Sequence, residues 1–309
     1  MGDLKLFHVN ASGAQQLPGK QSGLEKSLQT LMEANLETLL GVRFLATEYS
    51  TGKKHGGRID TLGLDEDGGP VIIEYKRHTD ENVINQGLFY LDWLLDHKAE
   101  FQLLVADKLG QQVATAIDWK NPRLVCIAGD FTRYDEHAVA QINRSIDLVR
   151  YRHYPGELLA LELLTATSAK ATAAGLVPPT LGGGGSGKTS PPTKTVSDYY
   201  AQADATLRGL CDDLDASLIS LGDDVTKKTT QLYFAYRRIK NFACVEVHPN
   251  NKQLLVYLKV NPDNVTLEMH FTRDVRKIGH FGTGDLEVRI MSAADLVKAE
   301  PLFLQSYNA

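Results

Sequence analysis

The segment from Gly56 to Arg77 constrains the fold of this chain more than any other stretch. Residues 58 to 64 alternate well enough for a strand, and residues 65 to 70 are rich in Asp, Gly and Pro, as in a tight turn. Residues 71 to 73 then form a β-branched apolar run, which is typical of a buried strand. The segment therefore predicts a β-hairpin whose second strand is buried.

Three charged residues occupy positions that a buried hairpin does not favour. Asp60 lies inside the first strand, and Glu74 and Lys76 lie at the end of the second. Side chains alternate along a strand, so Glu74 and Lys76 share a face, and hairpin pairing can place Asp60 opposite Glu74. Two carboxylates held so close repel each other, and a divalent cation relieves the repulsion. The hairpin alone also fits a simpler alternative, a surface hairpin with a cross-strand salt bridge.

A second feature divides the chain. Residues 180 to 195 are mainly Gly, Ser, Thr and Pro, and an Ala-rich segment from Ser168 precedes them. We therefore expect a first domain over residues 1–168, a flexible linker over 169–195 and a C-terminal domain over 196–309. Residues 182 to 189 satisfy the P-loop pattern, but prolines flank them where a P-loop needs a strand and a helix. No nucleotide site is expected there.

Composition excludes several classes of protein. No run of about 18 apolar residues occurs, so no membrane span is expected, and the first residues lack the apolar region of a secretory signal. The 3 cysteines are scattered, which favours neither a disulfide framework nor a metal site and fits a cytoplasmic protein. The formal net charge of -5 means that any binding of nucleic acid must use a local basic surface.

Periodic patterns in the first domain predict an α/β fold with a mixed central sheet. Strands are expected at residues 43–50, 58–64, 71–76, 123–128, 147–154 and 157–164, and helices at about 22–40, 80–97, 100–109 and 134–144, with a loop at 51–57. The first helix opens with a capping-box spacing at Ser22 and Glu25, and Thr79 or Asp80 can cap the second.

The C-terminal region predicts a small α+β domain. A helical stretch is expected over residues 196–221, strands over 242–248, 254–260, 265–271 and 286–290, and a closing helix from residue 293. Two polar groups in it each allow two interpretations. The first group is Arg237, Arg238 and Lys240 beside Tyr236 and Phe242. It could be the solvated face of an amphipathic helix, which we favour, or a surface that binds phosphates and bases. The second group is Arg276, His280, Asp285 and Glu287, which could form a polar pocket or brace a turn.

Asp60 followed by Glu74-Tyr75-Lys76 resembles the signature of the PD-(D/E)XK nucleases, and the order of elements is similar to the restriction-endonuclease-like core, a mixed sheet flanked by helices. Over residues 20–165 the chain resembles the nuclease domain of NucS-type (EndoMS) endonucleases. Four short segments carry this resemblance: Leu24-Glu25, Gly57-Arg58-Ile59-Asp60, Glu74-Tyr75-Lys76-Arg77 and Gln86-Gly-Leu-Phe-Tyr90. The C-terminal region resembles a small bacterial domain of unassigned function that follows such nucleases.

The resemblance implies a set of site residues. The catalytic residues would be Asp60, Glu74, Lys76, Glu25 and Gln86; Mg²⁺, or Mn²⁺ in its place, would be held by Asp60, Glu74 and the backbone carbonyl of Tyr75. Nucleic acid would contact Arg58, Arg77, Lys53, Lys54 and Tyr90. Simpler roles stay open for three of them, since Glu25 fits a helix cap, Gln86 a solvated helix residue and Tyr90 a packing residue.

The expected function is that of a Mg²⁺-dependent endonuclease that cuts DNA in repair, restriction or phage defence. A homodimer is expected, and the C-terminal domain would bind nucleic acid, a protein partner or another ligand. NucS-type proteins carry a DNA-binding domain ahead of the nuclease; since no such domain is recognised here, mismatch specificity is not part of the expectation. The alternatives are a catalytically inactive nucleic-acid-binding scaffold and an RNase.

Overall fold

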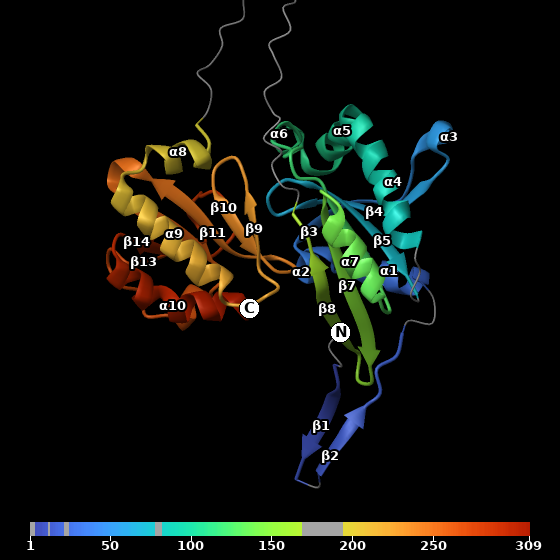
Figure 1. Cartoon of the computed structure of the whole chain (residues 1–309). Coiled ribbons are helices and arrows are strands. Elements are labelled where there is room, and N and C mark those ends of the chain that lie inside the picture. The colour runs from blue at the N-terminus through green and yellow to red at the C-terminus, as the bar shows by residue number, and fades with distance from the viewer. Residues whose placement is uncertain (1–3, 12, 22–24, 78–81, 169–193) are drawn as a thin grey trace, which may run out of the picture. The chain divides into compact units, whose positions relative to one another are not determined.

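The computed structural model describes residues 4–11, 13–21, 25–77, 82–168 and 194–309 (Figure 1). The chain forms two compact units. The first is Met1–Ser168 with Gly222–Thr226 and Arg237–Asn241, and the second is Ala169–Leu221 with Lys227–Tyr236 and Phe242–Ala309. Most of the predicted linker, the P-loop-like stretch and the predicted caps Ser22, Thr79 and Asp80 lie outside the described residues.

The first unit is built on a six-stranded mixed sheet. Its strands lie in chain order: β3 (Val42–Ser50), β4 (Arg58–Asp65), β5 (Pro70–Lys76), β6 (Arg123–Ala128), β7 (Ser145–Tyr154) and β8 (Leu158–Ala166). The β5–β6 and β6–β7 pairs are parallel, and the others are antiparallel. Parallel neighbours need a crossover connection. The crossovers are α4 (Asn82–Asp96), α5 (Lys98–Leu109) and α6 (Gln111–Thr115) before β6, and α7 (Arg133–Gln141) before β7. The predicted mixed α/β sheet flanked by helices is confirmed.

Helices cover both faces of the first sheet. On one face Ile72 packs in a buried cluster with residues of α4 to α7, such as Leu91 and Val139. On the other face Val71 and Ile73 pack against α1 (Glu25–Ala34) and α2 (Leu36–Leu40) (Figure 1). The uninterrupted apolar run of β5 is what a strand covered on both faces requires. The hairpin predicted from that run is confirmed.

Some expected elements differ in the structure. The predicted helix at 22–40 is interrupted at Asn35, and the predicted loop at 51–57 contains a short helix, α3 (Gly52–His55). An N-terminal hairpin of β1 (Leu6–Asn10) and β2 (Gly13–Leu17) was not predicted. Its residues are mostly exposed, and its second strand, Gly-Ala-Gln-Gln-Leu, has no apolar alternation from which a strand could be inferred.

In its described residues, the second unit contains a six-stranded sheet and three α-helices, which confirms the expected second α+β region. The strands lie in the order β13 (Thr272–Asp274), β14 (Leu286–Ile290), β12 (Gln253–Leu258), β11 (Asn241–His248), β10 (Phe234–Arg237) and β9 (Thr226–Thr229). The helices are α8 (Val196–Gln202), α9 (Ala205–Ile219) and α10 (Ala293–Tyr307). Within the described parts of the chain, every helix is too short or too polar to cross a lipid bilayer.

Two expectations about this unit are wrong. No strand forms over 265–271, because Glu268 is bonded through its backbone to Thr272 in a turn, and Met269 is 87% exposed despite the apolar alternation. The segment before Arg237 is strand β10 and not a helix. Tyr236 and Phe242 are buried, so their rings offer no base-stacking surface.

Of the two interpretations of the Arg276 group, the structure supports the braced turn. Arg276 forms ion pairs with Asp263 and Asp274, and the ring of His280 stacks on Tyr257.

Candidate active site

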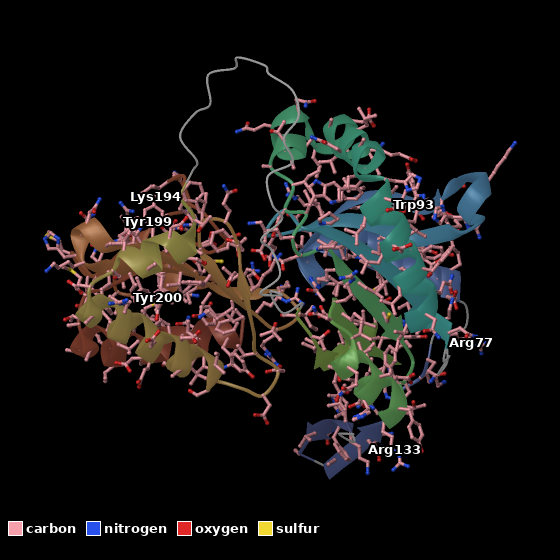
Figure 2. The ribbon with its side chains drawn as sticks, turned by 45° about the horizontal axis from the view of Figure 1, so that its top comes forward. Arg77, Trp93, Arg133, Lys194, Tyr199 and Tyr200 are labelled. Carbon is pink, nitrogen blue, oxygen red and sulfur yellow. The ribbon has the colours of Figure 1, made fainter. Side chains whose placement is uncertain are left out.

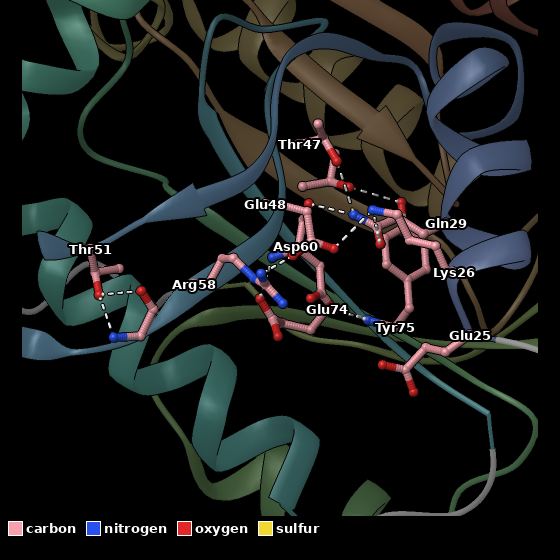
Figure 3. Close-up of polar contacts among 12 residues, drawn as sticks. Glu25, Lys26, Gln29, Thr47, Glu48, Thr51, Arg58, Asp60, Glu74 and Tyr75 are labelled. Carbon is pink, nitrogen blue, oxygen red and sulfur yellow. Dashed lines mark hydrogen bonds and ion pairs between the residues drawn. The ribbon is translucent and has the colours of Figure 1, made fainter.

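Asp60 and Glu74 meet where the β4–β5 ladder stops. The last backbone pair on this side is Thr61 with Ile73, so the next residues along the strands are Asp60 and Glu74. Here side chains replace the ladder: the Asp60 amide donates to Oε1 of Glu74 (3.2 Å), and the Tyr75 amide donates to Oδ2 of Asp60 (3.0 Å) (Figure 3). The structure therefore brings together the two carboxylates that the hairpin register predicted.

Glu74 is buried with unused hydrogen-bonding capacity. The residue is 0% exposed, and its Oε2 atom has no hydrogen-bond partner among the described residues. Burial, together with the neighbouring Asp60 carboxylate, raises the pKa of Glu74 to about 9. Burial also raises the pKa of Asp60, although the Tyr75 amide and Lys76 act in the opposite direction. Buried polar atoms are normally satisfied, so an orphaned carboxylate oxygen indicates a missing partner.

A hard divalent cation fits this pair of acids, because Mg²⁺ prefers oxygen ligands and is commonly held by only one or two carboxylates. Within the described part of the chain, no group of three or more His, Cys, Asp or Glu side chains is arranged to hold a metal ion. The remaining ligands would then be the Tyr75 carbonyl, water and substrate. The donor set suits Mg²⁺ or Mn²⁺ better than zinc, which favours nitrogen and sulfur ligands.

Lys76 and Glu25 lie at the rim of the pair. The Lys76 ammonium is 3.5 Å from Oε1 of Glu25, the first residue of α1. The Lys76 side chain is 17% exposed and the Glu25 side chain 41% exposed. The site thus continues from the buried Glu74 towards solvent through an ammonium group and a third carboxylate.

Gln86 and Tyr90 brace the strand that carries Asp60. The Tyr90 hydroxyl accepts hydrogen bonds from the Arg58 amide and from the Gln86 side chain, each at 3.2 Å. Tyr90 is buried, and a Cβ atom at Gly57 would lie 2.5 Å from its ring, so only glycine fits there. These contacts fix β4 against α4 just before Asp60. A direct contact of Gln86 or Tyr90 with nucleic acid stays a prediction.

Of the predicted basic residues, Lys53, Arg58 and Arg77 are exposed. Lys53 is exposed on α3, and the Lys54 side chain lies outside the described residues. The Arg58 side chain is 68% exposed and forms an ion pair with Glu48. Arg77 follows β5 and lies on the surface of the first unit (Figure 2). Their contacts with phosphate stay predictions.

Gln29 was not predicted and holds the backbone of Asp60. Its buried amide donates to the Asp60 carbonyl oxygen at 2.7 Å and to the Thr47 hydroxyl at 3.2 Å (Figure 3). One side chain therefore ties α1 to β3 and β4. The available signal was its position: Gln29 lies beside Leu28 on the buried side of α1, one turn after Glu25.

Glu48 was also missed. It forms ion pairs with Lys26 (2.9 Å) and with Arg58, and the hydrogen bond from Lys26 lowers its pKa. Glu48 lies between Thr47 and Tyr49, whose partners on β4 are Thr61 and Ile59, so it is level with Asp60. No sequence motif identifies Glu48, because an acidic residue in a strand that has no fixed spacing from the other site residues cannot be told apart from other acidic residues.

Comparison of the chain with known families and proteins gives two sequence matches. Residues 196–309 match a family model described as a domain of unknown function (DUF5655). Over 312 residues the chain is 27% identical to an uncharacterised protein of Haemophilus influenzae, and the match covers 94% of each chain.

Some solved structures match part of the chain. A repair endonuclease from Pyrococcus abyssi matches 42% of this chain and 48% of its own with 19% identity and a TM-score of 0.29. EndoMS bound to double-stranded DNA matches 42% of this chain and 45% of its own, also with 19% identity, and a TM-score of 0.25. The chain thus spans about half the length of these proteins.

Proposed function

We propose that this protein is a Mg²⁺-dependent endonuclease that hydrolyses phosphodiester bonds in DNA. The observation that supports the proposal most is the orphaned Oε2 of Glu74, buried on the strand next to Asp60. An unpaired buried carboxylate is unfavourable unless a ligand compensates it. The choice of DNA follows from the NucS-like segments around Asp60, Lys76 and Gln86.

Each residue has a role in this proposal. Asp60, Glu74 and the Tyr75 carbonyl would hold the cation, whose charge, when it is bound, offsets the negative charge of the phosphodiester. Lys76 would orient the attacking water and stabilise the charge that develops on the phosphate. Arg58 and Arg77 would bind phosphate oxygens, which a guanidinium group can do through two hydrogen bonds.

Incubation of the purified protein with matched DNA and RNA duplexes, in Mg²⁺ or in EDTA, tests the proposal. We expect cleavage of DNA in Mg²⁺, none in EDTA, and none by Asp60→Ala. Asp107→Ala is a matched control, because Asp107 is an exposed acid on α5 that pairs only with its neighbour Lys108 among the described residues.

Two outcomes would replace the proposal. Products from RNA alone would make the protein an RNase, and DNA binding without cleavage in Mg²⁺ or Mn²⁺ would make it a scaffold. Cutting both strands of a duplex favours paired sites, which a homodimer supplies. Light scattering of the protein with and without DNA tests this part of the proposal.

A further inference from the structure

Glu48 has an unusual backbone conformation for a residue within a strand. Among the described residues, the non-glycine residues with positive φ are Glu48 (50°), Glu157 (62°), Lys252 (51°) and His270 (67°). The last three lie in turns, whereas Glu48 lies inside β3. A left-handed backbone is unfavourable for a residue with a side chain, and it tends to occur at functional sites.

This conformation reverses the alternation of side chains along β3. Thr47 contacts Gln29 of α1, whereas Tyr49, two residues on, packs against Trp93 of α4, with ring centroids 5.6 Å apart. Residues two apart in a regular strand share a face. By the register of β3 and β4, Glu48 lies level with Asp60, at the point where the regular alternation of β3 is broken.

The Glu48 carboxylate holds two cations. One oxygen accepts from the Lys26 ammonium at 2.9 Å. The other forms an ion pair with Nε of Arg58 and has no hydrogen-bond partner among the described residues (Figure 3). The side chain of Arg58 makes no other ion pair or hydrogen bond among the residues that the structure describes. Its two terminal amino groups are therefore available, and its side chain is 68% exposed two residues before Asp60.

We propose that Glu48 is a positioning residue, which holds Arg58 by Nε so that the two terminal amino groups of Arg58 bind a phosphate of the nucleic acid cut at Asp60 and Glu74. This inference rests on the proposed function. Holding an arginine side chain in place before the phosphate arrives reduces the conformational entropy lost on binding and aligns its two donors.

A purely structural role for Glu48 makes a different prediction. If Glu48 served only to connect α1 with β3 through Lys26, its replacement would lower stability and leave the reaction of the folded protein unchanged. Asn tolerates the left-handed backbone better than Glu does, but its shorter side chain cannot span the same distance to Arg58. Glu48→Asn therefore separates the two roles.

The test is a double-mutant cycle on the single-turnover rate of DNA cleavage at saturating protein and Mg²⁺. We expect Glu48→Asn and Arg58→Ala each to lower the rate about 10- to 100-fold, since small losses of alignment have large effects on rate. The double variant should be within about twofold of Arg58→Ala, because both changes remove one interaction. The melting temperature of Glu48→Asn should stay level or rise. Lys252→Asn, at a left-handed position in a turn of the second unit, is the control and should leave the rate unchanged.

A second readout does not depend on cleavage. In ¹H–¹⁵N spectra at neutral pH, the Nε resonance of Arg58 should shift between the wild type and Glu48→Asn, because the ion pair with Glu48 is lost. An active wild type with an equally active Glu48→Asn would overturn the positioning role, and so would a rate loss that is additive with Arg58→Ala. A wild type that cuts no DNA would instead overturn the proposed function, so the two failures differ.

Discussion

The first sheet holds two fully buried carboxylates, and the protein satisfies them differently. Asp147 on β7 accepts from Nε of Arg123 at 2.6 Å and from a terminal amino group of the same guanidinium at 2.5 Å. Glu74 on β5 accepts from one backbone amide, has one orphaned oxygen, and forms no ion pair with any described residue. Both residues are 0% exposed.

The comparison separates a carboxylate that stabilises the fold from one that the fold tolerates. A buried ion pair with hydrogen bonds loses little by burial, whereas an uncompensated buried charge is strongly unfavourable. The raised pKa of Glu74 reflects that difference, with burial as its largest cause. Similar substitutions at the two positions should therefore change stability in opposite directions.

The largest effect is expected at the paired carboxylate. Asp147→Asn leaves the Arg123 guanidinium buried without its charge partner, so the free energy of unfolding should fall by about 3–5 kcal/mol. Denaturant titration of the full-length protein would measure this. DNA cleavage per folded molecule should not change, and a change of less than about 1 kcal/mol would remove the contrast between the two regions.

Lys76→Met should separate activity from stability. The Lys76 ammonium pairs only with the partly exposed Glu25 among the described residues, so its loss should change the free energy of unfolding by less than about 1 kcal/mol. Cleavage should fall by about 10²–10³-fold, as when one group that stabilises the transition state is removed. Single-turnover assays would measure this, and wild-type cleavage by the variant would contradict the assigned role.

Gly57→Ala should disturb the support of the Asp60 strand. The new Cβ atom would lie 2.5 Å from the Tyr90 ring, whose hydroxyl binds the Arg58 amide. Overpacking of this kind should lower the free energy of unfolding by about 1–3 kcal/mol and lower the cleavage rate. Gly209→Ala is the control, since nothing lies within 4 Å of its new Cβ in α9, and it should be neutral or stabilising.

Glu74→Gln should stabilise the metal-free protein in a pH-dependent way. The pKa of Glu74 is raised from 4.5 to about 9, so its favourable contribution is present below about pH 4.5 and is lost as the pH rises through about 9. In EDTA the variant should exceed the wild type by about 1–2 kcal/mol at pH 9, and the difference should shrink towards pH 5. Denaturant titrations at pH 5, 7 and 9 would measure this difference. A variant that is less stable than the wild type at pH 9 would contradict an unpaired charge on Glu74.

Much of the first unit could be predicted because its strands are apolar on both faces. The run Val71–Ile73 predicts a central strand, and the hairpin register places Asp60 level with Glu74, as the structure has them. The β1–β2 hairpin carries no such signal because its residues are exposed, and apolar alternation over 265–271 predicted a strand where a turn forms.

The supporting residues of the site could not be predicted from pattern alone. Gln29 acts through tertiary hydrogen bonds to β3 and β4, which no local spacing encodes. The position of the Glu48 side chain depends on a left-handed backbone conformation that glutamate rarely adopts, so backbone propensities would not predict it. The sequence thus indicates the acids that would hold the cation, whereas the residues that orient them and Arg58 are visible only in the folded structure.

Binding of Mn²⁺ measured by electron paramagnetic resonance tests the central claim most directly, because free Mn²⁺ gives a strong signal that is lost on binding. At pH 8 the wild type and Asp107→Asn should each bind Mn²⁺, whereas Glu74→Gln and Asp60→Asn should leave the free signal undiminished. Equal Mn²⁺ binding by all four proteins, or none by the wild type, would contradict a cation site formed by Asp60 and Glu74.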